Sequence, residues 1–570
     1  MAYNTQPAIR IDGFENECSQ GWEALWASVE NAGRIVIMDL YPGADQKQIT
    51  DHLASQFETI VDAQTIYQPR EYLEIMLKHH ITDDRIFGTM FYGTLQDFVS
   101  KENLELARKQ LDNPGRILVI GPGARLITRD GTLFYFDMSR WEIQLRYRQG
   151  MPSFFIPSAD EDPLRKIKTG FFVEWRVFDK YKMDLFDQVD VFVDLNTSQP
   201  KLAAGAAIRN ALAQAVRQPF RTVPYFDPGV WGGQWMKNVL KIERDDQNLA
   251  WSFDGVPEEN SLLLDFGPVQ FELPAMDLVL SHPRKLLGPK VFSRFGAEFP
   301  IRFDFLDTME GQNLSLQVHP LTEYIHRTFG MAYTQDESYY ILDAKDDASV
   351  FLGLKEDIDP QAMRKALEEA NRGGFPFDAE KFVNRFPARK HDHFLIPAGT
   401  VHCSGRNTMV LEISATPYCF TFKLWDWGRL GMDSLPRPVH LDHGFNNIQW
   451  DRTTSWVSKN LVDQTVLVSE KPGIREEKTG LHELEFIETR RFWVDPKARL
   501  EGDTRQSFRM LNLIEGDQIL VCSPQNRRKP FEVHYAETFI LPACLGPFEI
   551  INTGAHCAGL IQASIRHSES

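Results

Sequence analysis

Four polar residues in the middle of the chain have the types and spacing of a metal-binding set. In LSLQVHP, residues 314–320, Gln317 and His319 are two positions apart, so in a strand both side chains point to the same face. Glu337 begins the alternating segment ESYYIL, and His402 ends FLIPAGTVH. Two imidazoles, a carboxylate and an amide oxygen form a mixed nitrogen and oxygen set that suits Zn²⁺ and also accepts Mn²⁺, Fe²⁺, Co²⁺ or Ni²⁺. We therefore predict one site for a divalent metal ion.

Each of these residues, taken singly, has a simpler explanation. His319 and His402 could be ordinary histidines of a β-barrel, and Glu337 could be a surface carboxylate. The joint occurrence of QVHP, of a glutamate before an aromatic strand and of PAGTVH favours the metal site over these alternatives.

Such a set needs strands to bring it together, and the sequence predicts them from about Pro224 onward. Many short apolar runs are separated there by Gly and Pro turns, a pattern typical of sandwiches and barrels. The segment 361–374, preceded by Asp359 and Pro360, predicts a short helical insertion. After about Asn460 a second strand-rich block repeats the order of the first. We predict one metal-binding barrel over 216–455 and a second, structural barrel over 456–570.

In the first 215 residues short apolar runs alternate with helical stretches, a pattern that predicts an α/β domain. The apolar runs 34–41 and 116–120 end in Gly-Pro turns, and a helical stretch over 46–57 lies between them. A further run, 189–195, precedes an Ala-rich helix predicted over 201–215. The predicted fold class is therefore multidomain, an N-terminal α/β domain over 1–215 followed by two all-β barrels with a short helical insertion.

Four motifs carry a resemblance to a known family. QVHP, ESYYIL, the run LIPAGTVHCSG with the later VLEIS, and PGVWGG at 228–233 resemble the matching segments of class I mannose-6-phosphate isomerases. The resemblance covers about residues 220–450 well and extends more loosely to about 565. It implies two cupin (jelly-roll) barrels, zinc at Gln317, His319, Glu337 and His402, and interconversion of mannose 6-phosphate and fructose 6-phosphate.

The chemistry of an aldose-ketose isomerisation explains why a metal site suits it. Moving a proton between C1 and C2 passes through an enediol or enediolate, whose negative charge a divalent cation stabilises. A base within hydrogen-bond reach must carry the proton. Glu412, in VLEIS, is the candidate base, and its alternative is a structural carboxylate. Lys423 and Arg429 are candidates for binding the anionic end of a sugar phosphate.

Two positions depart from the family pattern. Gln335 stands where short members of the family commonly have Lys, and TFKLWDWGR, residues 421–429, has Lys423 in place of an Arg. Lysine keeps the charge but loses the planar fork that binds phosphate through two hydrogen bonds. A second hypothesis therefore stays open, a catalytically silent cupin that senses a sugar phosphate through a bound metal.

The N-terminal domain faintly resembles P-loop nucleoside or uridine kinases but has no phosphate loop. The motif GxxxxGK[ST] is missing, because the turn after 116–120 offers only Gly121, Gly123 and Arg125. A bifunctional enzyme with kinase activity is therefore the weakest hypothesis. We expect a degenerate domain that does not bind ATP and that regulates or dimerises the rest. The segment 136–150 contains Arg140, Arg146 and Arg148. These residues could bind a phosphorylated ligand, or they could simply form a solvent-exposed face of a strand or helix.

Composition limits the partners. The formal net charge of −17 opposes non-specific binding to nucleic acid or to an anionic membrane surface. Six cysteines without CxxC spacing, no signal-peptide pattern and no long apolar run predict a reduced, cytoplasmic protein that acts on a small sugar phosphate. In the second barrel His534 and His556 stand in unlike contexts and do not predict a metal site.

Overall fold

The computed structural model describes residues 3–157, 162–417, 420–524 and 529–566, and its chain divides into two units. Unit 1 comprises Met1–Pro7, Arg217–Val256 and Pro283–Ser570, and unit 2 comprises Ala8–Val216 and Pro257–His282. The chain passes from one unit to the other after residues 7, 216, 256 and 282, four times in all. Within the described ranges, no helix combines the length and the apolar character needed to cross a membrane.

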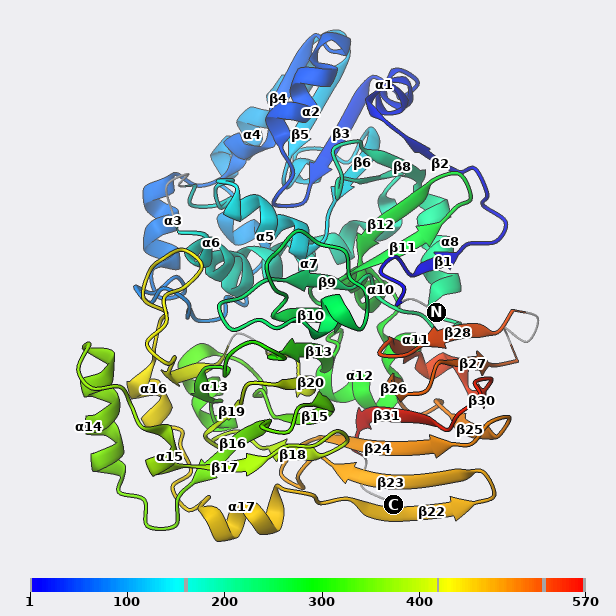
Figure 1. Ribbon diagram of the computed structural model, residues 1–570. Coiled ribbons are helices and arrows are strands. Elements are labelled where there is room, and N and C mark those ends of the chain that lie inside the picture. The colour runs from blue at the N-terminus through cyan, green and yellow to red at the C-terminus, as the bar shows by residue number, and fades with distance from the viewer. Residues whose placement is uncertain (1–2, 158–161, 418–419, 525–528, 567–570) are drawn as a thin grey trace. The chain divides into compact units, whose positions relative to one another are not determined.

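Unit 2 is built around a seven-stranded sheet whose order is β2-β8-β7-β6-β3-β5-β4 (Figure 1). Five neighbouring strands are parallel, and β8 and β2 continue the sheet in antiparallel fashion. The central parallel strands β3, β5 and β6 are mostly apolar and almost fully buried, as expected of strands covered on both faces, whereas the edge strand β4 is partly exposed. The seven strands are β2 (Cys18–Gln20), β3 (Ile35–Leu40), β4 (Thr59–Asp62), β5 (Ile117–Gly121), β6 (Thr132–Asp137), β7 (Val191–Asp194) and β8 (Lys201–Ala204).

Helices connect these strands. They are α1 (Trp22–Glu30), α2 (Gln46–Leu53), α3 (Arg70–Leu77), α4 (Lys101–Lys109), α5 (Arg140–Arg148), α6 (Pro163–Thr169), α7 (Trp175–Leu185) and α8 (Gly205–Ala215). The sequence-based prediction of a helix over the whole of 201–215 is wrong at its start. Residues Lys201–Ala204 form β8, because hydrogen bonding to β7 on one side and β2 on the other outweighs the helix preference of Leu and Ala.

The segment 257–282, which the sequence placed in the first barrel, belongs to unit 2. Its strands β11 (Ser261–Asp265) and β12 (Gln270–Pro274) form a three-stranded sheet with β1 (Ala8–Arg10), which pairs in parallel with β11. The helix α10 (Ala275–Ser281) brings Asp277 within 2.9 Å of the buried Lys182 amine, which also lies 2.7 Å from Asp137. This buried ion cluster ties the segment to the α/β sheet.

Unit 1 contains two pairs of antiparallel sheets, and the first pair holds the predicted metal-binding residues. Its six-stranded sheet has the order β18 (His393–Ile396), β15 (Glu337–Ala344), β20 (Thr408–Ala415), β13 (Ile301–Asp307), β10 (Trp251–Gly255) and β9 (Tyr225–Asp227). Its five-stranded sheet has the order β17 (Val383–Pro387), β16 (Ser349–Leu354), β19 (His402–Ser404), β14 (Leu316–Val318) and β21 (Phe422–Trp425). We call this pair the first sandwich.

The predicted helical insertion lies between two strands of the first sandwich. It is α14 (Pro360–Asn371), with Asp359 as its N-cap, Pro360 at its first position and Gly373 after its end at φ +84°. The other helices of unit 1 are α9 (Trp235–Asn238), α11 (Pro283–Leu287), α12 (Pro289–Phe295), α13 (Thr322–Phe329), α15 (Ala379–Phe382), α16 (Leu441–Phe445) and α17 (Thr454–Asn460).

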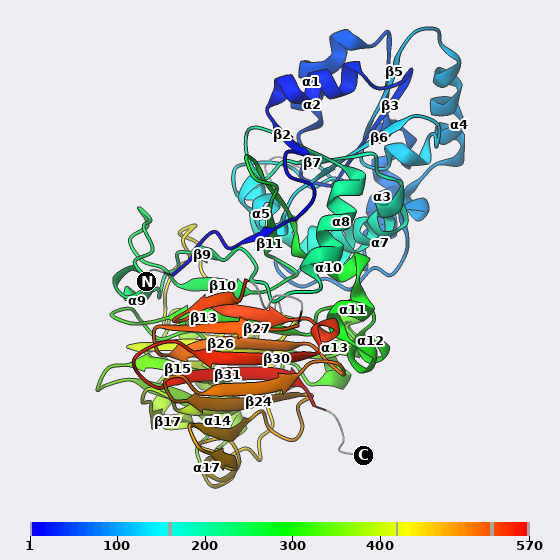
Figure 2. The same cartoon turned by 90° about the vertical axis from the view of Figure 1, so that its right-hand side faces the viewer.

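We call the second pair of sheets the second sandwich; in Figure 2 its orange and red strands run across the view, one above another. Its six-stranded sheet has the order β22 (Val466–Lys471), β23 (Ile474–Gly480), β24 (Ile487–Val494), β31 (Ala558–Ile565), β26 (Arg509–Glu515) and β29 (Thr538–Leu541). Its four-stranded sheet has the order β25 (Arg499–Asp503), β30 (Pro547–Asn552), β27 (Gln518–Cys522) and β28 (Phe531–His534). Side chains of both sheets, among them Leu513, Ile519 and Leu560, form one buried apolar cluster.

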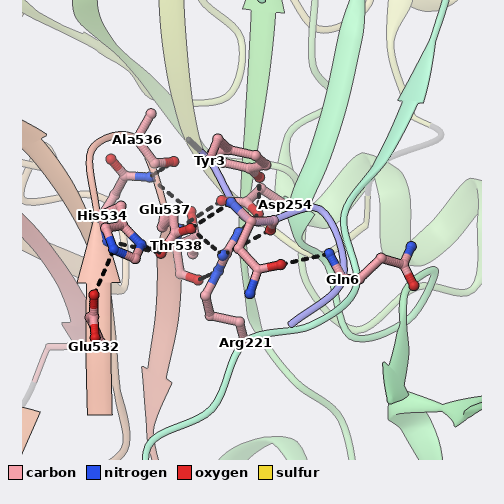
Figure 3. A network of polar contacts seen from close by, with 11 residues as sticks. Tyr3, Gln6, Arg221, Asp254, Glu532, His534, Ala536, Glu537 and Thr538 are labelled. Atoms are coloured by element: carbon pink, nitrogen blue, oxygen red, sulfur yellow. Dashed lines mark hydrogen bonds and ion pairs between the residues drawn. The ribbon is translucent and has the colours of Figure 1, made fainter. Parts of the chain in front are cut away.

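A buried ion network joins the two sandwiches (Figure 3). The Arg221 guanidinium lies 3.3 Å from Asp254 on β10 and 2.7 Å from Glu537, which directly precedes β29. Asp254 also accepts hydrogen bonds from the Tyr3 hydroxyl at 2.5 Å and from the Thr538 amide at 2.7 Å. Two carboxylates, from the two sandwiches, therefore share one guanidinium.

We predict that Arg221→Met destabilises unit 1 by about 3 to 5 kcal/mol, because it leaves Asp254 and Glu537 buried without a counter-charge. The measurement is the urea midpoint of the transition that unfolds the sandwiches. Arg244→Met is the matched control, because the Arg244–Asp246 pair is partly exposed and contributes about 1 kcal/mol or less. Equal midpoints for the two variants would show that the network does not hold the sandwiches together.

Candidate metal centre

The strands of the first sandwich bring the four predicted ligands to its interior. Gln317 on β14 is paired with His402, the first residue of β19, in the five-stranded sheet. His319 follows the end of β14 by one residue, and Glu337 opens β15 in the six-stranded sheet. His319, Glu337 and His402 have at most 1% solvent exposure, and Gln317 has 7%. The two sheets therefore direct their donor atoms toward one buried region.

The donor atoms are close enough to share an ion. His319, Glu337 and His402 each offer one ligand atom, and these three atoms lie within 4.8 Å of one another. His319 Nε2 is 3.1 Å from one Glu337 oxygen, and His402 Nε2 is 2.8 Å from the other. Tetrahedral ligands about 2.0 to 2.2 Å from zinc are about 3.3 to 3.6 Å apart. Moving the donors apart by less than about 1 Å would make room for the ion.

The amide of Gln317 completes the set. Its Nε2 atom is placed 3.2 Å from His402 Nε2. Because the two ends of an amide exchange by rotation about its last bond, the same side-chain position presents the oxygen to an ion. His319 Nε2 and Glu337 Oε1 have close neighbours but no well-aligned hydrogen bond among the described residues. Buried donor atoms that face one another in this way fit a metal ion better than a hydrogen-bond network.

The other nitrogen of each histidine is held by the backbone. His402 Nδ1 is 2.9 Å from the Thr400 carbonyl, and His319 Nδ1 is 3.2 Å from the Phe420 carbonyl. A carbonyl can only accept, so each Nδ1 carries a hydrogen and each Nε2 is the ring nitrogen left to face the centre. The backbone thus selects the tautomer that binds a metal through Nε2.

A tight turn places His402, and its glycine cannot be replaced. Gly399 has φ +87°, and a Cβ there would lie 2.8 Å from the Asn447 carbonyl oxygen. Its amide donates to the His319 carbonyl at 3.0 Å, which joins the turn to the strand of the other histidine. Arg452 donates to the Pro397 and Ala398 carbonyls of the same turn at 2.8 and 2.7 Å. Arg452 is a supporting residue that no motif in the sequence indicated.

The inner face of the six-stranded sheet carries further charges beside Glu337. Arg302 and Glu337 are both paired with Ser414 on β20, and Asp304 is paired with Glu412. Directly paired residues of antiparallel strands point to the same face, so Glu412 lies inside with the ligands, as the sequence predicted for its position. Arg302 and Asp304 form a buried ion pair. The sequence analysis missed them, although their alternation with Phe303 and Phe305 in IRFDFLD was a signal.

The ionisation of these carboxyl groups follows from burial and from their neighbours. Burial raises the pKa of Glu337, but the imidazoles of His319 and His402 outweigh it and hold that pKa below its ordinary value. Burial raises the pKa of Glu412 well above its usual range, and the carboxylates of Glu337 and Asp304 raise it further. Burial also raises the pKa of Asp304 to about 6, although Arg302 opposes the shift. Glu337 is therefore the ionised ligand, and Glu412 is the carboxyl group that most readily holds a proton.

The remaining predicted residues lie in different surroundings. Lys423 on β21 is paired with Gln317 and is half-buried on the same face of the sheet. Gln335 is buried, and its amide donates to Glu337 at 3.1 Å. Arg429 follows β21, where its guanidinium pairs with Asp426 and donates to the Asn313 carbonyl at 2.7 Å. The structure thus brings Lys423 and Gln335 next to the ligands, whereas the Arg429 guanidinium is held by a neighbouring loop.

In unit 2, the residues that were candidates for binding phosphate contact other groups of the protein. The amides of Gly123 and Arg125 donate to the Asp39 carboxylate at 3.0 and 2.8 Å, so the turn after β5 is occupied by a side chain of the protein. In the basic segment, Arg140 pairs with Asp179 at 2.5 Å, and Arg146 pairs with Glu142 at 2.8 Å.

The third arginine of this segment, Arg148, lies over the Trp141 ring at 5.1 Å. Arg140 is buried, not on a solvated face as the alternative reading had it. All three arginines of the segment thus have contacts within the protein, and these contacts do not indicate a phosphate ligand.

Comparisons with known proteins cover both parts of the chain. Residues 21–217 match a family described as a domain of unknown function, DUF8485. The chain is 25% identical over 351 residues to mannose-6-phosphate isomerase ManA of Bacillus subtilis, a match over 58% of this chain and 96% of that protein. It is 24% identical over 246 residues to mannose-6-phosphate isomerase of Streptococcus mutans, over 42% and 72% of the two chains. A solved structure of the Bacillus subtilis mannose 6-phosphate isomerase aligns with 60% of this chain at 20% identity and a TM-score of 0.49. Over more than half of its length, the chain is thus similar in sequence to proteins named mannose-6-phosphate isomerases.

Proposed function

We propose that the protein is a metal-dependent aldose-ketose isomerase that interconverts mannose 6-phosphate and fructose 6-phosphate in the first sandwich, a cupin barrel. The observation that carries the proposal is the convergence of His319, Glu337 and His402 inside the sandwich, within 4.8 Å of one another. The sequence similarity to named mannose-6-phosphate isomerases supports the choice of substrate.

In this proposal Gln317, His319, Glu337 and His402 hold one divalent cation, with Zn²⁺ the best fit to two imidazoles and a carboxylate. The buried Nε2 atoms and the Glu337 carboxylate face one another, so a cation between them would contact three electron-pair donors at once. Held by these residues, a divalent cation would supply the positive charge that stabilises negative charge developing on a substrate oxygen.

The residues of this chain divide the remaining tasks. Glu412 moves the proton between C1 and C2, because its carboxyl group is buried beside the ligands and its pKa is raised, so it can both accept and return a proton. Arg302 and Asp304 position it from the neighbouring strand β13. Lys423 binds the anionic end of the substrate from β21, where it is paired with Gln317. Arg429 holds the loop after β21 through Asp426 and contributes to the anionic end only if that pair opens.

The alternative of a silent sugar-phosphate sensor has one observation in its favour. Gln335 is uncharged and is hydrogen-bonded to Glu337, where a lysine of the family pattern would add positive charge. Binding without turnover would then be the expected outcome, and the isomerase assay below separates the two.

For unit 2 we propose a domain that neither binds nor transfers phosphate from ATP and that regulates or dimerises unit 1. The occupied turn at Gly123 and Arg125 and the absence of GxxxxGK[ST] from the sequence support this.

We predict that His402→Ala lowers the bound metal from about one ion per chain to well below half, because a direct bond to the ion is lost. Elemental analysis of the purified protein after dialysis measures it. His393→Ala is the matched control, because His393 is also buried in the first sandwich and bonds Ser338 at 2.8 Å, away from the ligands. Unchanged metal in His402→Ala, or an equal loss in both variants, would contradict the ligand assignment.

The protein loaded with zinc is expected to isomerise mannose 6-phosphate, and Glu412→Gln is expected to lower kcat by about 10² to 10⁴, the usual contribution of a proton-transfer group. Metal content must stay unchanged in the variant, so that the loss is assigned to proton transfer. Glu380→Gln, at an exposed position, is the control. No turnover of any aldose phosphate by the metal-loaded wild-type protein would favour the sensor.

Restoring the basic pattern of the family should raise the rate. We predict that Gln335→Lys together with Lys423→Arg increases kcat/KM for mannose 6-phosphate, since both groups face the buried ligands, where charge acts strongly. Each single change should do less, because the two residues act on one substrate. A folded, metal-loaded double variant with no gain in kcat/KM would show that these departures do not limit the reaction.

A further inference from the structure

The second sandwich encloses a cavity of about 520 Å³ that the isomerase site does not use. It opens beside the ends of β23, β24, β26 and β31, and Phe492 and Phe548 form part of its wall. The apolar cluster of the second sandwich includes both of these phenylalanines, so the interior changes there from an apolar core to a polar chamber. A chamber of this size is in the usual range for a small-molecule site.

The strand register shows that polar side chains of the inner face line this chamber, where apolar side chains form the core elsewhere in the sandwich. Arg490 on β24 is paired with Gln562 on β31, and Glu488 is paired with Ser564. On the other side of β31, Met510 is paired with Ala563, which brings Arg509 next to Ser564. These side chains share the inner face with Phe492, Leu511 and Leu560, because residues two apart on a strand point to the same side.

Arg509 is a half-buried cation on the wall of this chamber. In the part of the chain that the structure describes, its guanidinium has no hydrogen bond and no ion pair, although the residue is half-buried. The side chains of Gln562 and Ser564 beside it have no hydrogen-bond partner within the same described ranges. Burial and the nearby Arg490 guanidinium lower the pKa of Arg509, and they outweigh the carboxylates of Glu488 and Asp503, which raise it.

The acidic groups of the chamber, Glu476, Glu488, Glu501 and Asp503, form no ion pair with Arg509 among the described residues, although Glu488 and Asp503 attract its charge from a distance. Glu476 and Glu488 lie 2.6 and 2.8 Å from Arg490, and Asp503 pairs with Arg505 at 2.5 Å. A half-buried guanidinium without a partner is unfavourable, and a planar fork of donors matches the oxygens of phosphate or carboxylate. The missing partner of Arg509 is therefore an anion.

We propose that the second sandwich binds a small hydroxylated oxyanion, a sugar phosphate or a sugar acid, through Arg509. The phosphate or carboxylate group pairs with the Arg509 guanidinium, and the Gln562 amide and Ser564 hydroxyl bind oxygens next to it. Glu476 and Glu488 accept hydrogen bonds from ligand hydroxyl groups and keep their ion pairs with Arg490. Phe492 and Phe548 contact the carbon skeleton of the ligand. This site is separate from the metal centre, and its existence does not depend on the isomerase proposal.

The test is calorimetric titration of the full-length protein with glycerol 3-phosphate and with gluconate, with glycerol as the uncharged probe. The wild-type protein is expected to bind at least one of the anions and not glycerol, and Arg509→Gln should raise that Kd at least tenfold. Arg505→Gln is the matched control, because Arg505 is exposed and does not line the chamber. The tighter of the two anions tells a phosphate ligand from a carboxylate ligand.

Two further measurements keep the proposal separate from folding and from the metal centre. Arg509→Gln should retain the kcat/KM of the wild-type protein for mannose 6-phosphate, and without ligand its Tm should stay equal or rise, because an unpaired charge has been removed. A Tm lower by more than about 4 °C would make Arg509 a structural residue and overturn the proposal. Equal anion affinity in the wild-type protein and Arg509→Gln, or no anion binding at millimolar concentration, would overturn it as well.

Discussion

A carboxylate with no solvent exposure, Glu337, imposes the strongest constraint on the first sandwich. Burying a lone negative charge is very costly unless positive charge or donor groups surround it. The imidazoles of His319 and His402 flank the carboxylate, and the carbonyls of Thr400 and Phe420 hold their Nδ1 atoms so that each Nε2 faces Glu337. The tight turn at Gly399 and its bond to the His319 carbonyl thus serve the electrostatics of the centre as much as its shape.

The two sandwiches differ in the sign of the charge that their interiors leave unbalanced. In the first, Arg302 pairs with Asp304 on the inner face, which leaves Glu337 beside the two histidines. In the second, Glu476, Glu488 and Asp503 pair with other arginines, which leaves Arg509 without an ion pair among the described residues. One architecture, with alternating residues facing inward from both sheets, can therefore favour a cation in one copy and an anion in the other.

Motifs with strong local constraints were predictable from the sequence. Three of the candidate ligands, His319, Glu337 and His402, stand at or next to strand ends, where alternation and the PAGTVH turn determine direction, and their donor atoms lie within 4.8 Å of one another. The helix after Asp359 was equally predictable, because Pro360 and Gly373 mark its two ends. The pairing of strands that are far apart in the chain could not be predicted from the sequence. Nothing in the local sequence of 261–265 indicates that this strand pairs with residues 8–10.

The same limit applies to charged residues inside sheets. Arg302 and Asp304 have no motif, and only the register with β20 shows that they belong with Glu412. Arg509 reads as a surface residue until the strands on both sides are known. Local patterns predict which face a residue occupies, but the identity of its neighbours across the sheet depends on the whole topology.

The contacts of the first residues have a consequence for the order of events at the ribosome. The amide of Asn4 donates to Glu537, a partner 533 positions later in the chain. At about 5 to 20 residues per second, synthesis takes roughly half a minute to two minutes to cover that distance. Tyr3 and Asn4 can meet Asp254 and Arg221 much earlier, but the contact with Glu537 must wait for that residue. The ion network that joins the two sandwiches is therefore completed from the side of the second sandwich, after the strands of the first have been synthesised.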